Sequence, residues 1–358
     1  MNSVHHSVRA SFARLLVLAG LVSCSASPVG RWSEEKAAGW YEAQGWLAGA
    51  NYTTSTAINQ IEMWQEDTFD PETIDRELGW AEDLGFNTMR VFLSSVVWEN
   101  DPEGLKSRMD MFLDICTKHG IRPFFVFFDD CWDSESHYGK QRDPRPGIHN
   151  SGWVQDPSVS RRADTTTLYP VLQAYMKDII GTFRKDKRVL MWDVYNEPGN
   201  SGHLNESIPL LKNAFQWARE ARPTQPLTAA VTSQDFADLN RIQLAESDIV
   251  SLHTYSAPDL VEHAIDTLEA YRRPVMCTEY MARPFGCTFQ DVLPMLKRRN
   301  VAAVNWGFVA GKTNTIFPWG GSEMYGEPDV WFHDILRTDG SPYSNEEVEL
   351  IRTINGRS

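Results

Sequence analysis

The sequence is poor in cysteine and has no cluster of histidines. Its five cysteines form no C-x-x-C pair, so their spacing indicates neither a zinc ribbon nor a redox centre. It contains no His-x-His motif, which argues against a histidine-bound metal. No glycine-rich phosphate loop follows an early strand, which disfavours a doubly wound nucleotide-binding fold. We therefore expect no metal and no cofactor.

Positive charge is also scarce. Lys and Arg number 34 against 48 Asp and Glu, and without the first 23 residues they number 32 against 48, a net charge of −16. We expect such a chain to bind neither nucleic acid nor an anionic membrane surface. An uncharged oligo- or polysaccharide fits this charge. The 13 tryptophans supply flat, amphipathic surfaces of the kind that sugar rings need.

The N-terminus has the pattern of a bacterial export signal. Arg9 and Arg14 precede the apolar run Leu15–Val22, which is too short to span a membrane as a mature helix. The run leads into Leu-Val-Ser-Cys, which resembles a lipobox, so Cys24 is the expected site of lipid attachment. The alternative is an ordinary signal peptide with an incidental cysteine.

This pattern divides the chain into three parts. We predict a lipoprotein-type signal peptide at 1–23, a tether at 24–39 and one folded domain at 40–358. The protein is then expected to be exported and lipid-anchored to a bacterial membrane, in the periplasm or at the cell surface. Its only contact with the membrane would be the anchor at Cys24.

From Trp40 onward, short apolar segments alternate with amphipathic ones. The apolar segments are Trp46–Asn51, Asn87–Leu93, Arg122–Phe128, Val189–Asn196, Pro226–Val231, Asp248–Leu252, Pro274–Thr278 and Val301–Trp306. Alternating strands and helices predict a parallel sheet, and eight strands predict a single-domain (β/α)8 TIM barrel. Two long loops, Cys131–Asp164 and Gly307–Asp329, are expected to be functional. The last helices are expected at Val330–Leu336 and Asn345–Ile354.

The stretch Val189–Pro198 carries the strongest signal for a functional site. Its apolar run stops at Asn196-Glu197-Pro198. Because proline cannot donate to a sheet and disfavours a helical conformation in the residue before it, the strand should end here. A carboxylate at the C-terminal tip of a buried parallel strand is where barrel enzymes keep their chemistry.

The tips of the other predicted strands add further polar and aromatic residues. The carboxyl ends of barrel strands face one pocket, and the residues at these ends are Asn51, Arg90, Asp129, Asp130, Asn196, Glu197, His253, Tyr255, Glu279 and Trp306. Glu197 and Glu279 stand out as a pair, on the fourth and seventh strands. Two carboxyls on opposite sides of a pocket, with pKa values pushed apart by their surroundings, are what glycoside hydrolysis requires.

The order of these motifs resembles the retaining glycoside hydrolases of clan A, and the nearest pattern is the family-five, cellulase-like group. The shared features are Asn-Glu-Pro after the fourth strand, Glu after the seventh, Arg in the second, His-x-Tyr after the sixth and Trp after the eighth. Cys-Thr-Glu-Tyr at 277–280 also resembles the nucleophile strand of the clan's β-galactosidase-like members. The resemblance covers the chain from Trp40 to its end.

The resemblance implies a role for each carboxylate. Glu197 would be the acid/base and Glu279 the nucleophile of a covalent, retaining mechanism on O-glycosidic bonds. Arg90 and Tyr255 would hold the nucleophile ionised and oriented. Changing Glu279 should then abolish turnover, and changing Glu197 should hurt poor leaving groups most.

It also implies which residues bind the sugar. Asn196 would hydrogen-bond the 2-hydroxyl, His253 would contact the acid/base or the substrate, and Trp306 would stack under the reacting sugar. The third strand departs from the family pattern, because Asp129 and Asp130 stand where a His is usual. One of these aspartates could grip a terminal sugar. The alternative for them is a loop cap or a partner for an arginine of the following loop.

Several of these residues also have structural interpretations. Arg90 could form an ion pair within the barrel, His253 could be a buried core histidine, and Trp306 could belong to the core. Trp98 and Trp132 lie on loops at the presumed active face, together with Trp153 and Trp319, and could line sugar subsites.

Two other functions stay open at this point. One is a non-catalytic, sugar-binding surface lipoprotein that keeps a barrel as its scaffold, since fold alone cannot decide function. The other is a metal-assisted hydrolase that uses Asp129, Asp130 and His253 as ligands. The sequence leaves open which plant- or microbe-derived sugar is bound, and whether cleavage is internal or terminal.

Overall fold

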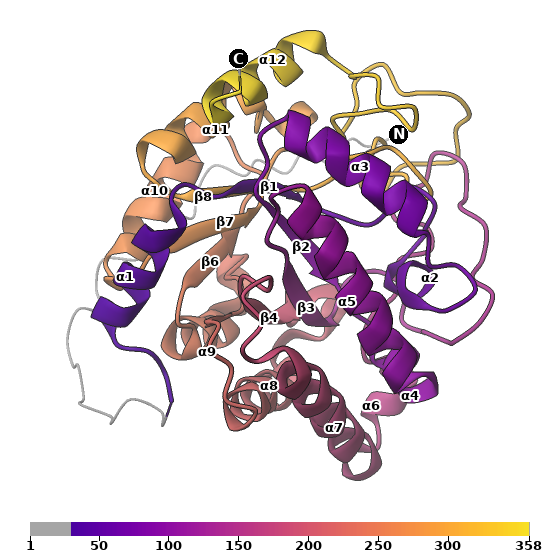
Figure 1. Cartoon of the computed structure of the whole chain (residues 1–358), viewed down its shortest axis with the longest axis vertical. Helices are drawn as coiled ribbons and strands as arrows, with labels where there is room; N and C mark the ends of the chain where they lie inside the picture. Colours follow the sequence, from indigo (N-terminus) through magenta and orange to yellow (C-terminus); the bar gives the residue numbers. More distant parts are fainter. Residues whose placement is uncertain (1–29, 358) are drawn as a thin grey trace, which may run out of the picture. The chain divides into compact units, whose positions relative to one another are not determined.

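Eight parallel strands pair edge to edge in the computed structural model, which describes residues 30–357 (Figure 1). Their order is β5-β4-β3-β2-β1-β8-β7-β6. A parallel bridge between Val231 and Leu252 links the β5 side to β6, so the ring is nearly closed. The predicted (β/α)8 barrel is therefore confirmed. The strands are β1 Ala48–Asn51, β2 Thr88–Phe92, β3 Phe124–Asp129, β4 Trp192–Asn196, β5 Leu227–Thr228, β6 Val250–His253, β7 Val275–Glu279 and β8 Ala302–Asn305.

Helices surround the strands, and local signals set where several of them begin. Asp70 caps α3 by accepting a hydrogen bond from the Thr73 backbone, and Asp101 caps α5 by accepting one from the Gly104 backbone. Each of these helices has a proline in its first turn. The helices are α1 Glu34–Gln44, α2 Gln60–Trp64, α3 Pro71–Asp83, α4 Ser95–Asn100, α5 Pro102–Lys118, α6 Val159–Arg162, α7 Thr165–Phe183, α8 Ile208–Glu220, α9 Ala237–Glu246, α10 Pro258–Glu269, α11 Phe289–Arg298 and α12 Asn345–Asn355.

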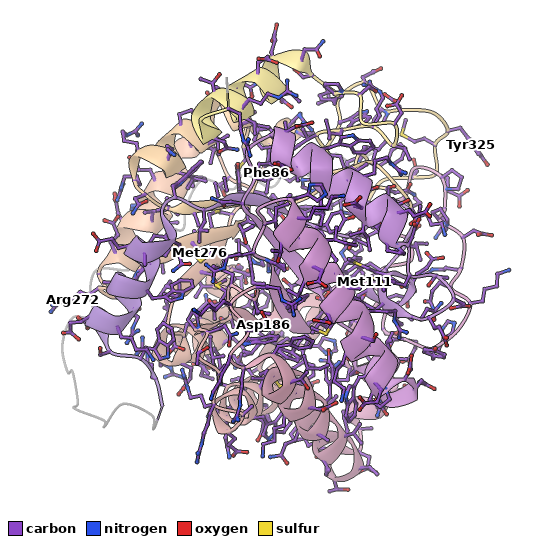
Figure 2. The ribbon with its side chains drawn as sticks, in the orientation of Figure 1. Phe86, Met111, Asp186, Arg272, Met276 and Tyr325 are labelled. Atoms are coloured by element: carbon purple, nitrogen blue, oxygen red, sulfur yellow. The ribbon has the colours of Figure 1, made fainter. Side chains whose placement is uncertain are left out.

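Helix α1 covers the N-terminal end of the barrel. Ala37 and Tyr41 pack against apolar residues from the beginnings of the strands, including Met276, which is fully buried (Figure 2). The Tyr41 hydroxyl accepts a hydrogen bond from the Ala302 backbone at 2.8 Å and donates to the Asn300 carbonyl at 3.0 Å. Trp32 is buried as well. The folded unit begins at Trp32, so the expectation of a tether is wrong for residues 32–39.

The predicted helix over Val330–Leu336 is also wrong. The apolar spacing suggests a helix, but the backbone groups of this segment bond to other parts of the chain. Ile335 and Leu336 donate to the Phe308 carbonyl. The Arg283 guanidinium binds the carbonyls of Trp331, His333 and Asp334. Tertiary contacts therefore replace the hydrogen bonds that a helix would make internally.

The loops after β3 and β8 are long, as expected. The first contains only the short helix α6, and the second runs without a helix to its exposed outer edge, where Tyr325 extends outward (Figure 2). Among the helices of residues 30–357, none combines the length and the apolar character needed to cross a membrane. The predicted signal peptide and Cys24 lie outside the described residues.

Candidate active site

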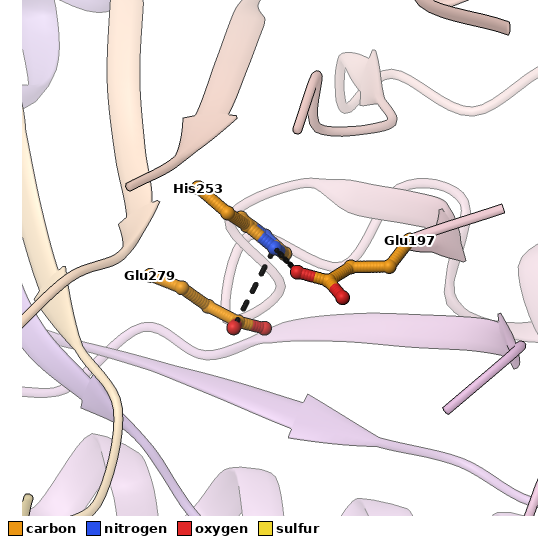
Figure 3. A group of neighbouring side chains, drawn as sticks. All are labelled: Glu197, His253 and Glu279. Carbon is orange, nitrogen blue, oxygen red and sulfur yellow. Dashed lines mark hydrogen bonds and ion pairs between the residues drawn. The ribbon is translucent and has the colours of Figure 1, made fainter. Parts of the chain in front are cut away.

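Glu197 and Glu279 meet at the C-terminal mouth of the barrel. Glu279 is the last residue of β7, and Glu197 directly follows β4. An oxygen of each carboxyl lies within 4.8 Å of the other. The imidazole of His253, at the end of β6, reaches both: its Nδ1 is 2.8 Å from Glu197 Oε1 and 3.5 Å from Glu279 Oε2 (Figure 3). The structure thus brings the two predicted carboxylates together.

The backbone of Glu197 is unusual. Its φ angle is +42°, a left-handed conformation that residues other than glycine seldom adopt. Pro198 follows it, and the Asn200 side chain donates to Glu197 Oε2 at 2.6 Å. Strained backbone of this kind gathers at functional sites, where the surrounding structure holds it in place.

Glu279 is held by two strong donors. Arg90 Nη1 lies 2.7 Å from Oε1, and the Tyr255 hydroxyl donates to Oε2 at 2.7 Å. Burial raises the pKa of Tyr255 well above its ordinary range, so the phenol remains a donor. Glu279 itself is buried, which makes these charge-assisted hydrogen bonds stronger than they would be in water.

Arg90 is fully buried and all its partners are acceptors. Nε and Nη2 donate to Asp193 at 3.0 and 2.8 Å, Nη1 also donates to Asn51 at 2.9 Å, and Nη2 donates to Asn196 at 2.8 Å. Both interpretations of Arg90 therefore apply, since it forms an ion pair inside the barrel and also holds the carboxylate of Glu279.

The surroundings push the pKa values of the two carboxyls in opposite directions. Burial raises the pKa of Glu279; the charges of His253 and Arg90 act against this rise, and the Glu197 carboxylate adds to it. Burial acts to raise the pKa of Glu197, but the hydrogen bond and charge of His253, together with the hydrogen bonds from Asn200 and Cys131, lower it overall. Groups this close titrate as a coupled pair.

Asn196 and Asp129 hold each other. The Asn196 amide donates to Asp129 Oδ1 at 2.9 Å, and the indole of Trp153 donates to Asp129 Oδ2 at 2.7 Å. Burial raises the pKa of Asp129 to about 7. With both oxygens occupied by protein donors, Asp129 orients Asn196. The prediction that Asp129 grips a sugar is corrected.

Asp130 faces away from the two carboxylates. It accepts from the Tyr195 hydroxyl and the Gly199 backbone at 2.7 Å, and it pairs with Arg162 at 2.7 Å. It has no exposed surface. Adjacent residues of a strand point to opposite sides, so only one of the two aspartates can face the barrel interior. The structural alternative, an arginine partner, holds for Asp130.

Trp98 lies outside the site. It belongs to α4, its indole donates to Asp178 of α7 at 2.8 Å, and its ring packs against Tyr175 of the same helix. The prediction that it lines a sugar subsite is therefore wrong. Trp132 stays a candidate, because it is 38% exposed and stacks on His149 beside the mouth.

Two residues of this network were not predicted from the sequence. The Cys131 thiol lies 3.4 Å from Glu197 Oε2, and Asp193 anchors Arg90 from within β4. Asp193 carried a usable signal, because a carboxylate in the middle of a buried strand requires a cationic partner. Cys131 carried none beyond its position after Asp129-Asp130. All four cysteines in residues 30–357 are free thiols.

Solved structures similar to this chain share its barrel. No protein-family model matches the sequence, and no curated protein matches it. The exo-β-1,4-mannosidase Op5Man5 from Opitutaceae bacterium strain TAV5 aligns with a TM-score of 0.59 and 17% identity over 91% of this chain, which spans 62% of that protein's length. The chain has the fold of the family-five glycoside hydrolases. A GH5_18 protein from Streptomyces cattleya, in complex with GlcNAc, aligns with a TM-score of 0.59 and 14% identity. The alignment covers 88% of this chain and 81% of that one.

For a third family-five structure, the alignment with this chain extends over the whole length of the other protein. It is the xyloglucan-specific endo-β-1,4-glucanase XEG5A from a metagenomic library, in complex with cellotriose, with a TM-score of 0.56 and 14% identity over 90% of this chain and 100% of that one. The resemblance to the family-five group is thus confirmed for the fold.

A hollow of about 340 Å³, which includes space open to solvent, lies beside Trp306 at the mouth of the barrel. Trp306 is partly buried, and its ring meets Phe92 and Trp153 edge to face at 6.0 and 6.1 Å. Asn51 also lines the hollow, although its amide donates to the Thr278 carbonyl at 2.8 Å. Trp306 is therefore neither wholly core nor wholly exposed, as a platform for a sugar ring requires.

The proposed metal ligands do not come together. Asp129 and Asp130 face different partners, as described above. Within residues 30–357, the group of three side chains close enough to share a metal ion is Glu197, His253 and Glu279. A cation there would be close to the permanent positive charge of Arg90, 2.7 Å from Glu279, which disfavours metal binding.

Proposed function

We propose that this protein is a retaining β-glycoside hydrolase that acts on an uncharged oligo- or polysaccharide. The observation that carries the proposal is the close approach of Glu197 and Glu279, with oxygens within 4.8 Å. Retaining enzymes keep their two carboxyls about 5–5.5 Å apart, whereas inverting enzymes need about 6.5–9.5 Å to admit a water.

The reaction proceeds in two displacements. Glu279 attacks the anomeric carbon while Glu197 donates a proton to the leaving oxygen, so the glycosidic bond breaks and a glycosyl ester forms on Glu279. Glu197, now a carboxylate, then takes a proton from water, whose oxygen attacks the same carbon and releases Glu279. Each step inverts the configuration, so the product retains it.

The contacts of the two carboxyls support these roles. The pKa directions run the other way, since burial raises the pKa of Glu279, whereas the hydrogen bonds to Glu197 and the charge of His253 lower the pKa of Glu197. Arg90, however, cannot lose its charge and favours an ionised Glu279 at all working pH values. Within residues 30–357, Glu197 forms no ion pair with an Arg or Lys. Burial acts to raise its pKa and so favours the protonated acid.

Product stereochemistry and variant rescue test the proposal. A panel of aryl β-glycosides of glucose, mannose, xylose and galactose identifies the sugar, and NMR should show the β-anomer as first product. The Glu279→Ala variant should be inactive and, with azide, should give an α-glycosyl azide. The Glu197→Ala variant should give a β-glycosyl azide and lose most activity on poor leaving groups. An α-anomer as first product would exclude a retaining mechanism, and interchanged azide products would reverse the two roles.

The same panel addresses the other functions. A non-catalytic sugar-binding protein would bind these glycosides without turnover. A metal-assisted hydrolase would lose activity after exhaustive chelation, whereas a two-carboxylate enzyme keeps it.

We also propose that the chain is an exported lipoprotein, anchored through Cys24. The support is the basic, apolar and Leu-Val-Ser-Cys order of residues 1–24. In a bacterial host, the Cys24→Ala variant should fail to incorporate labelled palmitate and leave the membrane fraction. Unchanged labelling of that variant would place the modification elsewhere.

A further inference from the structure

The hollow beside Trp306 lies across the barrel mouth from Glu197. It is formed at the tips of β1, β2 and β8 together with the two long loops. In the strand order, β3, β2 and β1 separate β4, which Glu197 directly follows, from β8, which Trp306 directly follows. In a ring of eight strands, β4 and β8 are opposite one another.

The two long loops are joined above this side of the mouth. The Asn150 backbone donates to the Thr313 carbonyl at 2.8 Å, and the Asn314 amide donates to the carbonyls of Arg145 and Ile148 at 2.8 and 3.1 Å. His149 Nδ1 is 2.8 Å from the Phe317 carbonyl. These contacts are mostly to backbone, so they fix the course of both chains.

A third segment, at the end of β1, completes this structure. The Asn59 amide donates to the Gly152 carbonyl at 2.9 Å, and the Gln60 amide donates to Val154 at 2.6 Å. Lys312 pairs with Glu62 at 2.8 Å. We call segments 55–62, 141–154 and 311–324 together the loop wall. The long loops lie side by side next to α2 in Figure 1.

The loop wall stands where the non-reducing part of a substrate must go. The leaving group has to be next to the acid, Glu197, on the β4 side. The sugar that reacts with Glu279 therefore extends its other end toward β1, β2 and β8. A polysaccharide chain continuing in that direction would meet the loop wall.

Asp334 supplies an unused acceptor in the hollow. Its side chain is buried, Oδ2 accepts from the Thr315 hydroxyl at 2.6 Å, and Oδ1 accepts no hydrogen bond of ordinary geometry. Both residues line the hollow. Gly307 packs closely beside this oxygen, since a Cβ there would lie 2.6 Å from it. A buried carboxylate oxygen without a donor is costly unless a ligand supplies one.

We propose that the enzyme cleaves from the non-reducing end, with the terminal sugar enclosed by the loop wall and one of its hydroxyls donating to Asp334. This inference rests on the proposed glycosidase function, since it assigns the direction and extent of the substrate in the same site. It makes Asp334 a specificity-determining residue that touches the substrate.

The direction of cleavage is tested with the unaltered protein. Aryl mono- and disaccharide β-glycosides first identify the sugar. A β-linked pentasaccharide of that sugar should then release one small product of constant size from the earliest times. The same pentasaccharide with a bulky acetal on its non-reducing terminal residue should resist cleavage. A ladder of internal products, or equal cleavage of the capped substrate, would overturn the inference. Failure to hydrolyse any glycoside would instead refute the proposed function.

The role of Asp334 is tested by the isosteric Asp334→Asn variant. Its KM for the best aryl glycoside should rise at least about tenfold, with little change in kcat, because a hydrogen bond to a charged acceptor is lost. In a panel of monodeoxy glycosides, one compound should show the same KM with both proteins, which identifies the hydroxyl. Asp329→Asn, at an exposed position nearby, is the matched control. An unchanged KM in the Asp334 variant would refute the contact.

Discussion

Asp193 accepts two hydrogen bonds from Arg90, at 3.0 and 2.8 Å, and neither side chain has any exposed surface. Through this pair, a carboxylate inside β4 fixes the guanidinium that contacts Glu279. The position of the nucleophile therefore depends on a residue that never meets the substrate.

The first prediction concerns this anchor. Asp193→Asn removes one of the buried negative charges that pair with Arg90, so the free energy of unfolding should fall by about 3–5 kcal/mol. A displaced Arg90 should also lower turnover by roughly a hundredfold. Denaturant unfolding and aryl-glycoside kinetics measure the two effects. Asp114→Asn breaks an exposed pair with Arg188 and should cost less than about 1 kcal/mol. Equal effects of the two variants would contradict the proposed anchoring.

A second prediction follows from the coupling of the two carboxyls. The charge of Glu197 raises the pKa of Glu279, so Glu197→Gln should lower it. The acid limb of the kcat/KM profile should then move to lower pH. An activated aryl glycoside is the proper substrate, because it needs no proton from Glu197. Glu206→Gln, at an exposed position, should leave the limb in place. A shift to higher pH in the Glu197 variant would show that the carboxyls are not coupled in this way.

A third prediction concerns Cys131. Its thiol donates to Glu197 and helps to lower the pKa of that carboxyl. Removing the donor in Cys131→Ala should raise the pKa of Glu197, so the protonated acid persists to higher pH. With a substrate that has a poor leaving group, the basic limb of the kcat/KM profile should move to higher pH. Cys131→Ser keeps a donor and should retain the original limb. Identical profiles for the two variants would mean that the thiol does not act on Glu197.

A fourth prediction concerns stability and pH. Burial raises the pKa of Asp334 to about 6, above the value of about 3.9 in an unfolded chain. Folding therefore favours the protonated form, and its contribution to stability is full below about pH 4 and is lost as pH rises through about 6. Asp334→Asn keeps the uncharged state, so its stability relative to the unaltered protein should increase by up to about 3 kcal/mol between pH 4 and pH 8. Urea unfolding at both pH values measures this; a pH-independent difference would mean that Asp334 does not titrate as described.

The barrel and its carboxylate pair could be predicted because both depend on patterns along the chain. Apolar segments alternate with helices, and parallel strands bring their carboxyl ends to one mouth. Pro198 ends β4 directly after Glu197, so that residue had to lie at the mouth. Glu279 is the last residue of its strand, β7, although no proline follows it.

The partners of these residues could not be predicted from the same patterns. Asp129 and Asp130 are neighbours of one type, and the sequence does not show which of them faces Asn196; in the structure it is Asp129, the last residue of β3. The sequence predicts a loop around Trp98, but Ser94 caps the short helix α4 by accepting a hydrogen bond from the Val97 backbone, and that helix places Trp98 against α7. The segment after Asp329 has helical spacing, but Arg283 and Phe308 take its backbone groups. Each of these outcomes depends on residues distant in sequence.

Helix α1 covers the N-terminal end of the barrel, and the Tyr41 hydroxyl both accepts a hydrogen bond from the backbone and donates one to it. A truncated chain for expression that started at Trp40, where the apolar alternation begins, would lack most of this helix. It would leave the apolar side chains at the barrel floor open to water, and exposed patches of that kind promote aggregation. A chain that starts before Trp32 keeps helix α1 whole, so these apolar side chains stay covered and do not promote aggregation.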